Sequence, residues 1–519
     1  MILRARLSAV LPIAAVAAAL TVAGCGGGGG GAGSADPASL APASSPLFIE
    51  ATIRPKGELK SNIESLTKTL AGISDPGSLI VNQLDSAMRE NDPSLSYQDD
   101  IEPWLGEKGG LFMQHYDGQS FSGVAAILQT TDSAEAQDFI DKISQTSDSP
   151  VKQGSYEGVD YSTSTNDGTT VGVVDDLFVA AEDLGAFKSA VDASSGSSLS
   201  ENKQYKVALA GAPGGSLADV YVNVGDLIKS AGAQVDQQVL QFYDSIGIDF
   251  SNSTALASIV PGADQVEIDA TTSAAGGMGT GNVTDFLGSF PAGSFIAYAA
   301  PDVGSQFKKV IDGFDKNGIP GEVAPGQLKS TLGAAGINLD RIASEIGNVG
   351  VFVEGGGGAG LSGALVVQSD SAKSASGIVS DVESFVRRAG ATGFKQVPGG
   401  FSLTDRANFG SQPVVVVSRG DRVAIGYGDK AAQQAVSGSG ATLSGNATFK
   451  DAAKSLGGTS IIGFLDIGSV LKLAESTGGL SGADYRQAKP YLDKLDFAAI
   501  GGGTSGDTTT SKVIVKLKG

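Results

Sequence analysis

The chain of 519 residues is acidic, with 36 Lys and Arg against 56 Asp and Glu and a formal net charge of −20. This charge argues against a nucleic-acid partner, because nucleic-acid binding needs clustered basic side chains. A single cysteine excludes an internal disulfide. A single histidine leaves too few ligands for a histidine-based metal site. We therefore expect no metal and no cofactor.

Residues 1–24 have the layout of a secretory signal peptide: two arginines, an apolar run, and small residues before Cys25. The stretch Val-Ala-Gly-Cys at 22–25 resembles a bacterial lipobox. That resemblance implies signal cleavage between Gly24 and Cys25 and attachment of a diacylglycerol to the Cys25 sulfur. An ordinary signal peptide with an incidental cysteine is the alternative.

Residues 25–45 continue from the cysteine through six glycines into a stretch rich in Ala, Ser and Pro. This composition predicts a flexible tether without a core. The acidic surface argues against direct contact with anionic lipid, so the lipid on Cys25 would be the membrane contact. Several acyl chains would anchor the protein far more firmly than one. We therefore expect an exported protein that is lipid-anchored and faces the extracytoplasmic side of a cell membrane.

From residue 46 onward, alternating and helical apolar patterns follow one another. The elements predicted in the first half are, in chain order, a strand at 47–53, a helix carrying Leu59, Ile63, Leu66 and Leu70, a hairpin over 110–129, a helix over 136–143, a hairpin over 169–182 that turns at Asp175 and Asp176, a helix over 235–246 and a strand at 265–273. Hairpins therefore dominate the predicted strands.

The second half repeats the first at a spacing of about 240 to 245 residues. "GLFMQHYDGQSFSG" at 110–123 matches "GVFVEGGGGAGLSG" at 350–363, and "YVNVGDLIK" at 221–229 matches "FLDIGSVLK" at 464–472. The repeat predicts two copies, 46–289 and 290–519. Copy two then contains a helix over 375–386, a hairpin over 414–427 that turns at 419–421, and a closing strand at 512–518.

These patterns predict an α+β fold made of two tandem homologous copies. Each copy should be a largely antiparallel sheet, because its strands are joined mainly by hairpins, with helices packed on one face. The two copies should pack as a pseudo-symmetric pair.

Two segments resemble an uncharacterised family of bacterial lipoproteins, known only as a domain of unknown function. They are "PLFIEATIRPKGELKSNIESL" at 46–66 and "FPAGSFIAYAAP" at 290–301. The resemblance implies membership of that family over both copies. It implies no activity and no site residues.

Several residues invite a chemical interpretation, and each has a plainer structural one. His115, at the end of a predicted strand, is expected to be a surface histidine, and the glycines at 355–358 a hairpin loop, because no Lys-Ser or Lys-Thr follows them. Arg-Gly-Asp at 419–421 is ordinary turn chemistry. The acidic residues Asp99, Asp100, Glu102, Asp175, Asp176, Glu182 and Asp183 are expected to serve turns and helix starts, and Trp104 to be a packing anchor.

No catalytic constellation is visible, so we expect a protein that is not an enzyme. The first hypothesis is a membrane-anchored lipoprotein that binds another, unidentified component of the cell envelope. A carrier of a lipid or another hydrophobic small molecule is the second hypothesis. A carboxylate-dependent envelope hydrolase is the third, and it predicts two acidic residues that face each other in a cleft with raised pKa values.

Overall fold

The computed structural model describes residues 35–519 except 147–149, 233–236, 276–280, 319–323, 335–337, 356–359, 389, 405–411, 439, 477–481 and 507. Cys25 and the predicted cleavage site lie outside the described residues. The chain divides into two compact units. Unit 1 comprises Met1–Gln237 and Phe250–Ala274, and unit 2 comprises Gln238–Asp249 and Ala275–Gly519.

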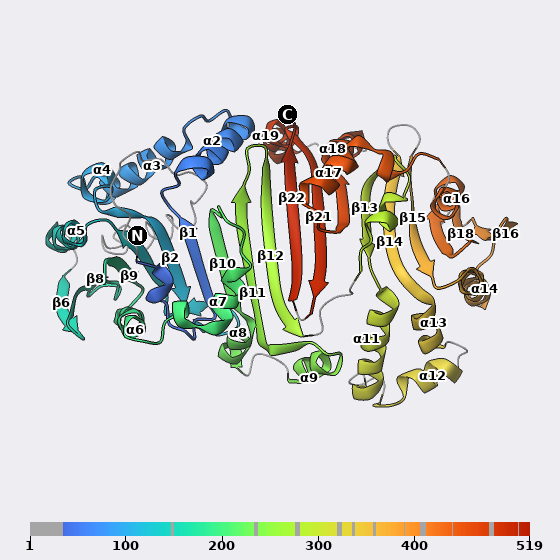
Figure 1. Ribbon diagram of the computed structural model, residues 1–519, viewed down its shortest axis with the longest axis horizontal. Coiled ribbons are helices and arrows are strands. Elements are labelled where there is room, and N and C mark those ends of the chain that lie inside the picture. The colour runs from blue at the N-terminus through green and yellow to red at the C-terminus, as the bar shows by residue number, and fades with distance from the viewer. Residues whose placement is uncertain are drawn as a thin grey trace. The chain divides into compact units, whose positions relative to one another are not determined.

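Unit 1 is built around an antiparallel sheet (Figure 1). Its elements in chain order are η2 (Pro37–Ser39), β1 (Leu47–Thr52), α2 (Gly57–Ala71), α3 (Pro76–Asn91), α4 (Tyr97–Asp100), β2 (Leu105–Met113), β3 (His115–Tyr116), β4 (Phe121–Ser122), β5 (Ala125–Thr130), α5 (Ser133–Thr146), β6 (Val151–Tyr156), β7 (Val159–Ser164), β8 (Thr170–Val174), β9 (Leu177–Ala181), α6 (Leu184–Ser194), η3 (Leu199–Glu201), α7 (Lys203–Ala210), β10 (Ala218–Asn223), α8 (Val224–Ala231), β11 (Asp249–Pro261) and β12 (Gln265–Ala275). The paired strands follow the order β11-β10-β1-β2-β5-β9-β8-β7-β6.

Unit 2 is built around a second antiparallel sheet. Its elements are α9 (Gln237–Ser245), α10 (Thr284–Gly288), β13 (Ser294–Ala300), α11 (Val303–Asn317), α12 (Leu328–Ala334), α13 (Leu339–Glu345), β14 (Ile346–Gly355), β15 (Leu361–Ser369), α14 (Ala372–Arg388), β16 (Phe394–Val397), β17 (Gly400–Leu403), β18 (Val414–Arg419), β19 (Arg422–Tyr427), α16 (Asp429–Ser437), η6 (Leu443–Gly445), α17 (Ala447–Ser455), β20 (Ile461–Asp466), α18 (Ile467–Ser476), α19 (Ala483–Leu492), β21 (Leu495–Ser505) and β22 (Thr508–Leu517). The paired strands follow the order β22-β21-β20-β13-β14-β15-β19-β18-β17-β16.

The two units share this strand order over their paired strands. The first strand of each sheet, β1 or β13, lies between the next long strand of the unit, which pairs with it antiparallel after three intervening helices, and a strand from late in the unit. Two further details correspond. Asn202 begins α7 and donates its side-chain N–H to the carbonyl of Ala43, and Asn446 begins α17 and donates to the carbonyl of Ala292 in the same way. Positions in the two units can therefore be compared strand by strand.

The prediction that helices pack on one face of each sheet is wrong. On β5, Ile127 belongs to a core with α6, whereas its neighbour Leu128 belongs to a core with α5 on the opposite face. Unit 2 repeats this on β19, where Ala424 faces α16 and Val423 faces α14. A central strand that is buried at every residue requires cover on both faces.

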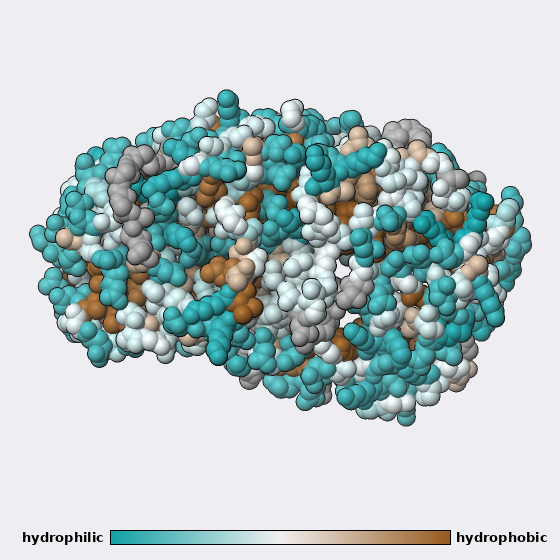
Figure 2. Space-filling model, in the orientation of Figure 1, coloured by the Kyte–Doolittle hydropathy of each residue, from teal (hydrophilic) through white to brown (hydrophobic). Residues whose placement is uncertain are grey.

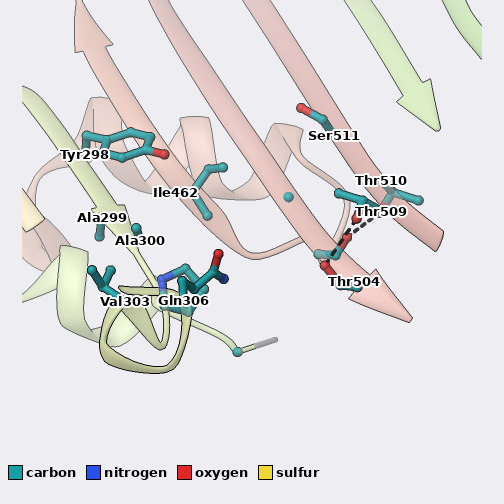
Figure 3. A pocket seen from close by; sticks show the side chains of 14 residues that line it. Tyr298, Ala299, Ala300, Val303, Gln306, Ile462, Thr504, Thr509, Thr510 and Ser511 are labelled. Carbon is teal, nitrogen blue, oxygen red and sulfur yellow. Dashed lines mark hydrogen bonds between the residues drawn. The ribbon is translucent and has the colours of Figure 1, made fainter. Parts of the chain in front are cut away.

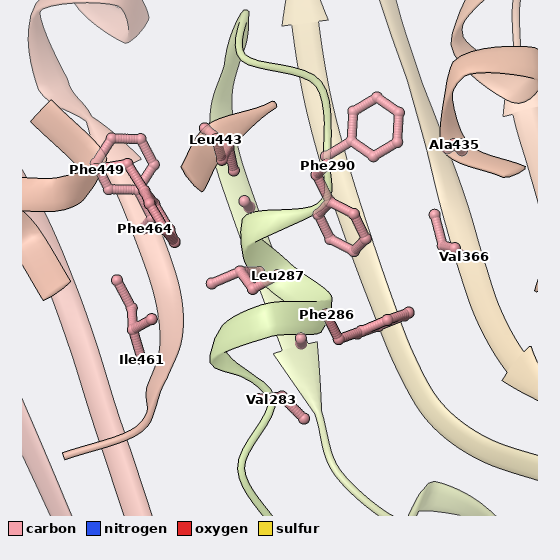
Figure 4. Close-up of a cluster of buried hydrophobic side chains, with 14 of the residues drawn as sticks. Val283, Phe286, Leu287, Phe290, Val366, Ala435, Leu443, Phe449, Ile461 and Phe464 are labelled. Carbon is pink, nitrogen blue, oxygen red and sulfur yellow. The ribbon is translucent and has the colours of Figure 1, made fainter. Parts of the chain in front are cut away.

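The largest of these cores lies in unit 2 and is aromatic at its centre (Figure 4). Phe286 and Phe290 meet with ring centroids 5.3 Å apart, and Phe290 meets Phe352 of β14 at 5.4 Å. Residues 283–290 therefore belong to unit 2, so the copy boundary predicted between 289 and 290 lies too late in the chain. The helix predicted over 235–246 also packs in unit 2, because the ring centroids of Phe242 in α9 and Phe314 in α11 lie 4.5 Å apart.

The predicted tether is wrong for its last residues. Ala38, Leu40 and Ala41 are completely buried in the core of unit 1. Asp36 begins the short helix η2 by accepting a hydrogen bond from the N–H of Ala38. A few apolar residues suffice to dock this segment because β1 and β2 leave a site beneath it, where Gly110 faces Pro37 without a side chain.

Candidate binding site

The sheet of unit 2 opens between β13 and β20. These strands are in register from Ile296↔Leu465 to Tyr298↔Gly463, and no pair follows, although β13 continues to Ala300. In unit 1 the corresponding strands β1 and β10 stay paired as far as Ala51↔Ala218. The sheet of unit 1 is therefore closed at the point where the sheet of unit 2 opens.

A pocket of about 240 Å³ lies in this opening between β13 and β20 (Figure 3). One wall is formed by the end of β13 and the start of α11, with Tyr298, Ala300, Val303 and Gln306. The opposite wall is Ile462 of β20 together with the β21–β22 hairpin, which contributes glycines and threonines. Among the described residues that line the pocket, none is an Asp, Glu, Lys, Arg or His.

Small residues create this space. Gly502 and Gly503 follow one another on β21, and Gly503 has no neighbour within 4 Å of the place where a Cβ would stand. Helix α11, which brings Val303 and Gln306 to the wall, packs closely against α13 and the start of β14, because Gly304 approaches the carbonyls of Ala343 and Ile346, where a Cβ would be only 2.1 Å from each oxygen. The pocket thus depends on glycines on both of its sides.

An apolar row crosses the sheet beside the pocket. Tyr298 of β13 lies opposite Val351 of β14, which lies opposite Leu365 of β15. Their exposed fractions are 45%, 38% and 40%. The corresponding residues of unit 1 are Ile49, Leu111 and Ala126, and Leu111 and Ala126 are buried there. Figure 2 shows apolar side chains that reach the surface among hydrophilic ones over the strands of unit 2. We call Tyr298, Val351 and Leu365 the open row.

Unit 1 carries a charged cluster where unit 2 has its pocket. Glu50 of β1 lies opposite Asp219 of β10, and the corresponding residues of unit 2 are Ala299 and Ile462. Glu50 Oε1 lies 2.5 Å from Lys108 Nζ. Asp219 accepts hydrogen bonds from the hydroxyls of Ser216 at 2.6 Å and Ser258 at 2.5 Å. The site is filled by polar groups that satisfy one another.

This cluster shifts two pKa values. Burial raises the pKa of Glu50, and the neighbouring Lys108 ammonium only partly offsets that effect. Burial alone would lower the pKa of Lys108, but the Glu50 carboxylate raises it. Glu50 and Asp219 are neighbouring carboxylates of the kind that the hydrolase hypothesis called for, but Lys108 already pairs with Glu50, and the hydroxyls of Ser216 and Ser258 already donate to Asp219.

The structure separates the other residues singled out in the sequence. His115 is exposed on β3 and pairs in register with Ser122. Trp104 is buried, stacks within 5.1 Å of Phe178, and donates its indole N–H to the carbonyl of Asp100, so it is a packing anchor as predicted.

The acidic residues serve turns, helix starts and ion pairs. Asp183 accepts the N–H of Ala186 at the start of α6, and Asp100 pairs with Lys142 at 2.6 Å. Asp175 and Asp176 have φ values of 46° and 60° in the β8–β9 turn, and Asp176 contacts the hydroxyl of Ser133. Within the described residues, no group of three or more His, Cys, Asp or Glu side chains is arranged to hold a metal ion.

The two glycine-containing loops are hairpin turns where they are described. Gly420 of the Arg-Gly-Asp stretch has a φ of 58° between β18 and β19, and Asp421 accepts a hydrogen bond from Gln368. Gly355 pairs with Leu361 at the end of the β14–β15 hairpin, and the next three glycines lie outside the described residues. In the part of the chain that is described, no helix combines the length and apolar character needed to cross a membrane.

Comparisons with known proteins identify the family. Two crystal structures, form I and form III of TP0453, are similar to parts of this chain at 9% and 10% sequence identity, with TM-scores of 0.23 and 0.24. They cover 46% and 47% of this chain and 79% and 82% of their own chains. No curated protein matches. A family model described as Protein of unknown function (DUF3352) matches residues 79–517. Because the match covers most of this chain, the chain belongs to that family of unknown function.

Proposed function

We propose that this chain is an exported, lipid-anchored, non-enzymatic binding protein of the cell envelope, and that the open row of unit 2 is its binding surface. The two units would be homologous copies of one domain, of which the second has become the binding unit. The N-terminal sequence supports export and anchoring, because a signal-like segment ends in a lipobox-like stretch at Cys25. The shared strand order of the units supports their homology.

The observation that carries the proposal is the exposure of the open row. Tyr298, Val351 and Leu365 adjoin one another on three neighbouring strands, and each is more than one-third exposed. Contiguous apolar surface of this kind marks interaction sites, whereas single exposed apolar residues need no explanation. An envelope protein that presents an apolar segment would cover the row.

An affinity-capture experiment tests this proposal. The full chain and its Leu365→Glu variant would be used to capture partners from a cell-envelope extract. The control is Val207→Glu, because Val207 of α7 is 74% exposed and lies in unit 1. The proposal expects a partner that is recovered by the wild type and the control but lost with Leu365→Glu. Equal recovery by all three proteins would contradict it.

The pocket favours a second function, the binding of a hydrophobic small molecule. Its volume of about 240 Å³ lies below the roughly 300 to 1,000 Å³ of pockets that enclose a drug-sized ligand. The pocket therefore suits part of an apolar molecule better than a whole one.

A further inference from the structure

We propose that the pocket of unit 2 binds the end of a single saturated alkyl chain that carries an uncharged, hydrogen-bonding head group. This rests on the second function proposed above and deepens it, because it names the class of ligand that the pocket takes; it is independent of the partner proposed for the open row. Three features of the molecule support it: the different residues at the corresponding positions of unit 1, the size of the pocket, and the placement of the polar groups that line it.

Unit 2 lacks the polar side chains that unit 1 has at three corresponding strand positions. In unit 1, Glu50, Asp219 and Ser258 lie side by side on the paired strands β1, β10 and β11. In unit 2, the corresponding positions hold Ala299, Ile462 and Gly501. At these three positions each polar side chain is replaced by a smaller or apolar residue, and β13 and β20 part instead of pairing. The result is an apolar space with nothing in it to bind a charge.

The lining excludes a charged ligand inside the pocket. None of the described lining residues carries a full charge, so an enclosed carboxylate or phosphate would have no ionic partner. Burying an unpaired charge is far more costly than burying a hydrocarbon. The volume of about 240 Å³ corresponds to about eight methylene-sized groups, if each takes roughly the 30 Å³ of a water molecule.

Hydroxyl groups lie at one side of the pocket. Thr504 and Thr509 face each other with their hydroxyl oxygens 3.5 Å apart, and the Thr510 hydroxyl donates to the carbonyl of Gly503 at 3.4 Å (Figure 3). Both contacts are long for hydrogen bonds between such groups. The hydroxyls of Thr509 and Thr510 can therefore exchange these contacts for shorter ones to the alcohol or ester oxygen of a ligand. On the opposite wall Ala300 and Val303 are apolar and lie beside Gln306, and Ile462, on the same wall as the threonines, adds apolar surface that suits the chain.

The test is calorimetric titration of the full chain carrying Cys25→Ser, which has no site for acyl chains of its own. The probes are 1-hexanol, 1-octanol, 1-decanol and octanoate. Affinity should rise about fourfold for each added methylene. The rise should stop near the eight groups that the pocket holds, and octanoate should bind at least tenfold more weakly than 1-octanol. Equal affinity for the alcohol and the carboxylate would overturn the proposal, as would an affinity that does not depend on chain length.

Two variants place the binding in the pocket. Ile462→Asp should weaken 1-octanol binding at least tenfold, whereas Val515→Asp, which adds a charge at another half-buried strand position of unit 2, should leave it unchanged. Ala300→Leu adds volume without charge and should move the plateau to shorter alcohols. Thermal unfolding confirms that each variant is folded. Unchanged binding by folded Ile462→Asp and Ala300→Leu variants would overturn the assignment.

The two proposals fail separately. Leu365 is not among the residues that line the pocket, so Leu365→Glu should bind 1-octanol like the wild type. Alkanol binding without any captured partner would reject the binding surface and keep the pocket. Partner capture that depends on Leu365, without alkanol binding, would reject the pocket as a ligand site and keep the binding surface.

Discussion

Tyr298 and Gly463 form the last registered pair between β13 and β20 in unit 2. Beyond them the strands part, and Tyr298 both lines the pocket and begins the open row. The equivalent strands of unit 1 remain paired as far as Ala51 and Ala218. A difference of a few residues in strand pairing thus separates a closed unit from one with an accessible apolar site.

The anchor predicts where the protein is found in the cell. Cys25→Ser should move the chain from the membrane fraction to the soluble fraction, because each buried methylene of an attached acyl chain contributes about 0.8 kcal/mol to membrane binding. Fractionation of cells that express the wild type and the variant measures this directly. A Cys25→Ser chain that remains in the membrane fraction would contradict lipid anchoring.

The docking of residues 35–45 predicts a cost in stability. Leu40→Ala should destabilise unit 1 by about 2 to 5 kcal/mol, because the side chain is completely buried and its removal leaves a cavity. The fluorescence of Trp104, the single tryptophan, reports the urea unfolding of unit 1. A midpoint equal to that of the wild type would mean that this segment is the tether that its composition suggests.

Much of the fold was predictable from local patterns. The strand predicted at 47–53 is β1, and the stripe of Leu59, Ile63, Leu66 and Leu70 is on α2, where Ile63 and Leu66 are buried. The hairpin that turns at Asp175 and Asp176 is β8 and β9. These features depend on neighbouring residues, so periodicity and turn chemistry reveal them.

Other features depended on contacts between distant residues. The second helical layer depends on the tertiary contacts of Ile127 and Leu128, which face different cores. The opening after Tyr298 depends on strand register between segments far apart in the chain. One signal was present in the sequence: the repeat that aligns "YVNVGDLIK" with "FLDIGSVLK" also aligns Asp219 with Ile462, two residues before these stretches.

The close packing of helix α11 at Gly304 allows a steric test of the pocket wall. Gly304→Ala would bring a Cβ to 2.1 Å from the carbonyl oxygens of Ala343 and Ile346, so the helix must shift. We expect a loss of about 1 to 3 kcal/mol in the stability of unit 2. Gly333→Ala in α12 is the matched control, because its Cβ would have no neighbour within 4 Å. Circular dichroism during urea unfolding should distinguish them, and equal curves would refute the close approach.

The buried carboxyl of Glu50 predicts a pH dependence. Burial raises its pKa above the usual value of 4.5, so the folded protein holds this proton more tightly than the unfolded chain. The resulting stability is fully present below the unfolded pKa and is lost as the pH rises through the folded pKa. The Glu50→Gln variant has no carboxyl to ionise at this position and does not lose this stability. Its free energy of unfolding relative to the wild type should therefore increase between pH 4 and pH 7. Trp104 fluorescence during urea unfolding measures the difference, and a constant or falling difference would contradict the assignment.

The most direct test of the proposed binding surface is photo-crosslinking in intact cells. A benzophenone amino acid would be placed at Leu365 in the open row and, as a control, at Val207 in unit 1, whose side chain is more exposed than that of Leu365. Our account predicts a discrete crosslinked product from position 365 and none from position 207. Crosslinking at both positions alike, or at position 207 only, would show that the open row of unit 2 is not the binding surface.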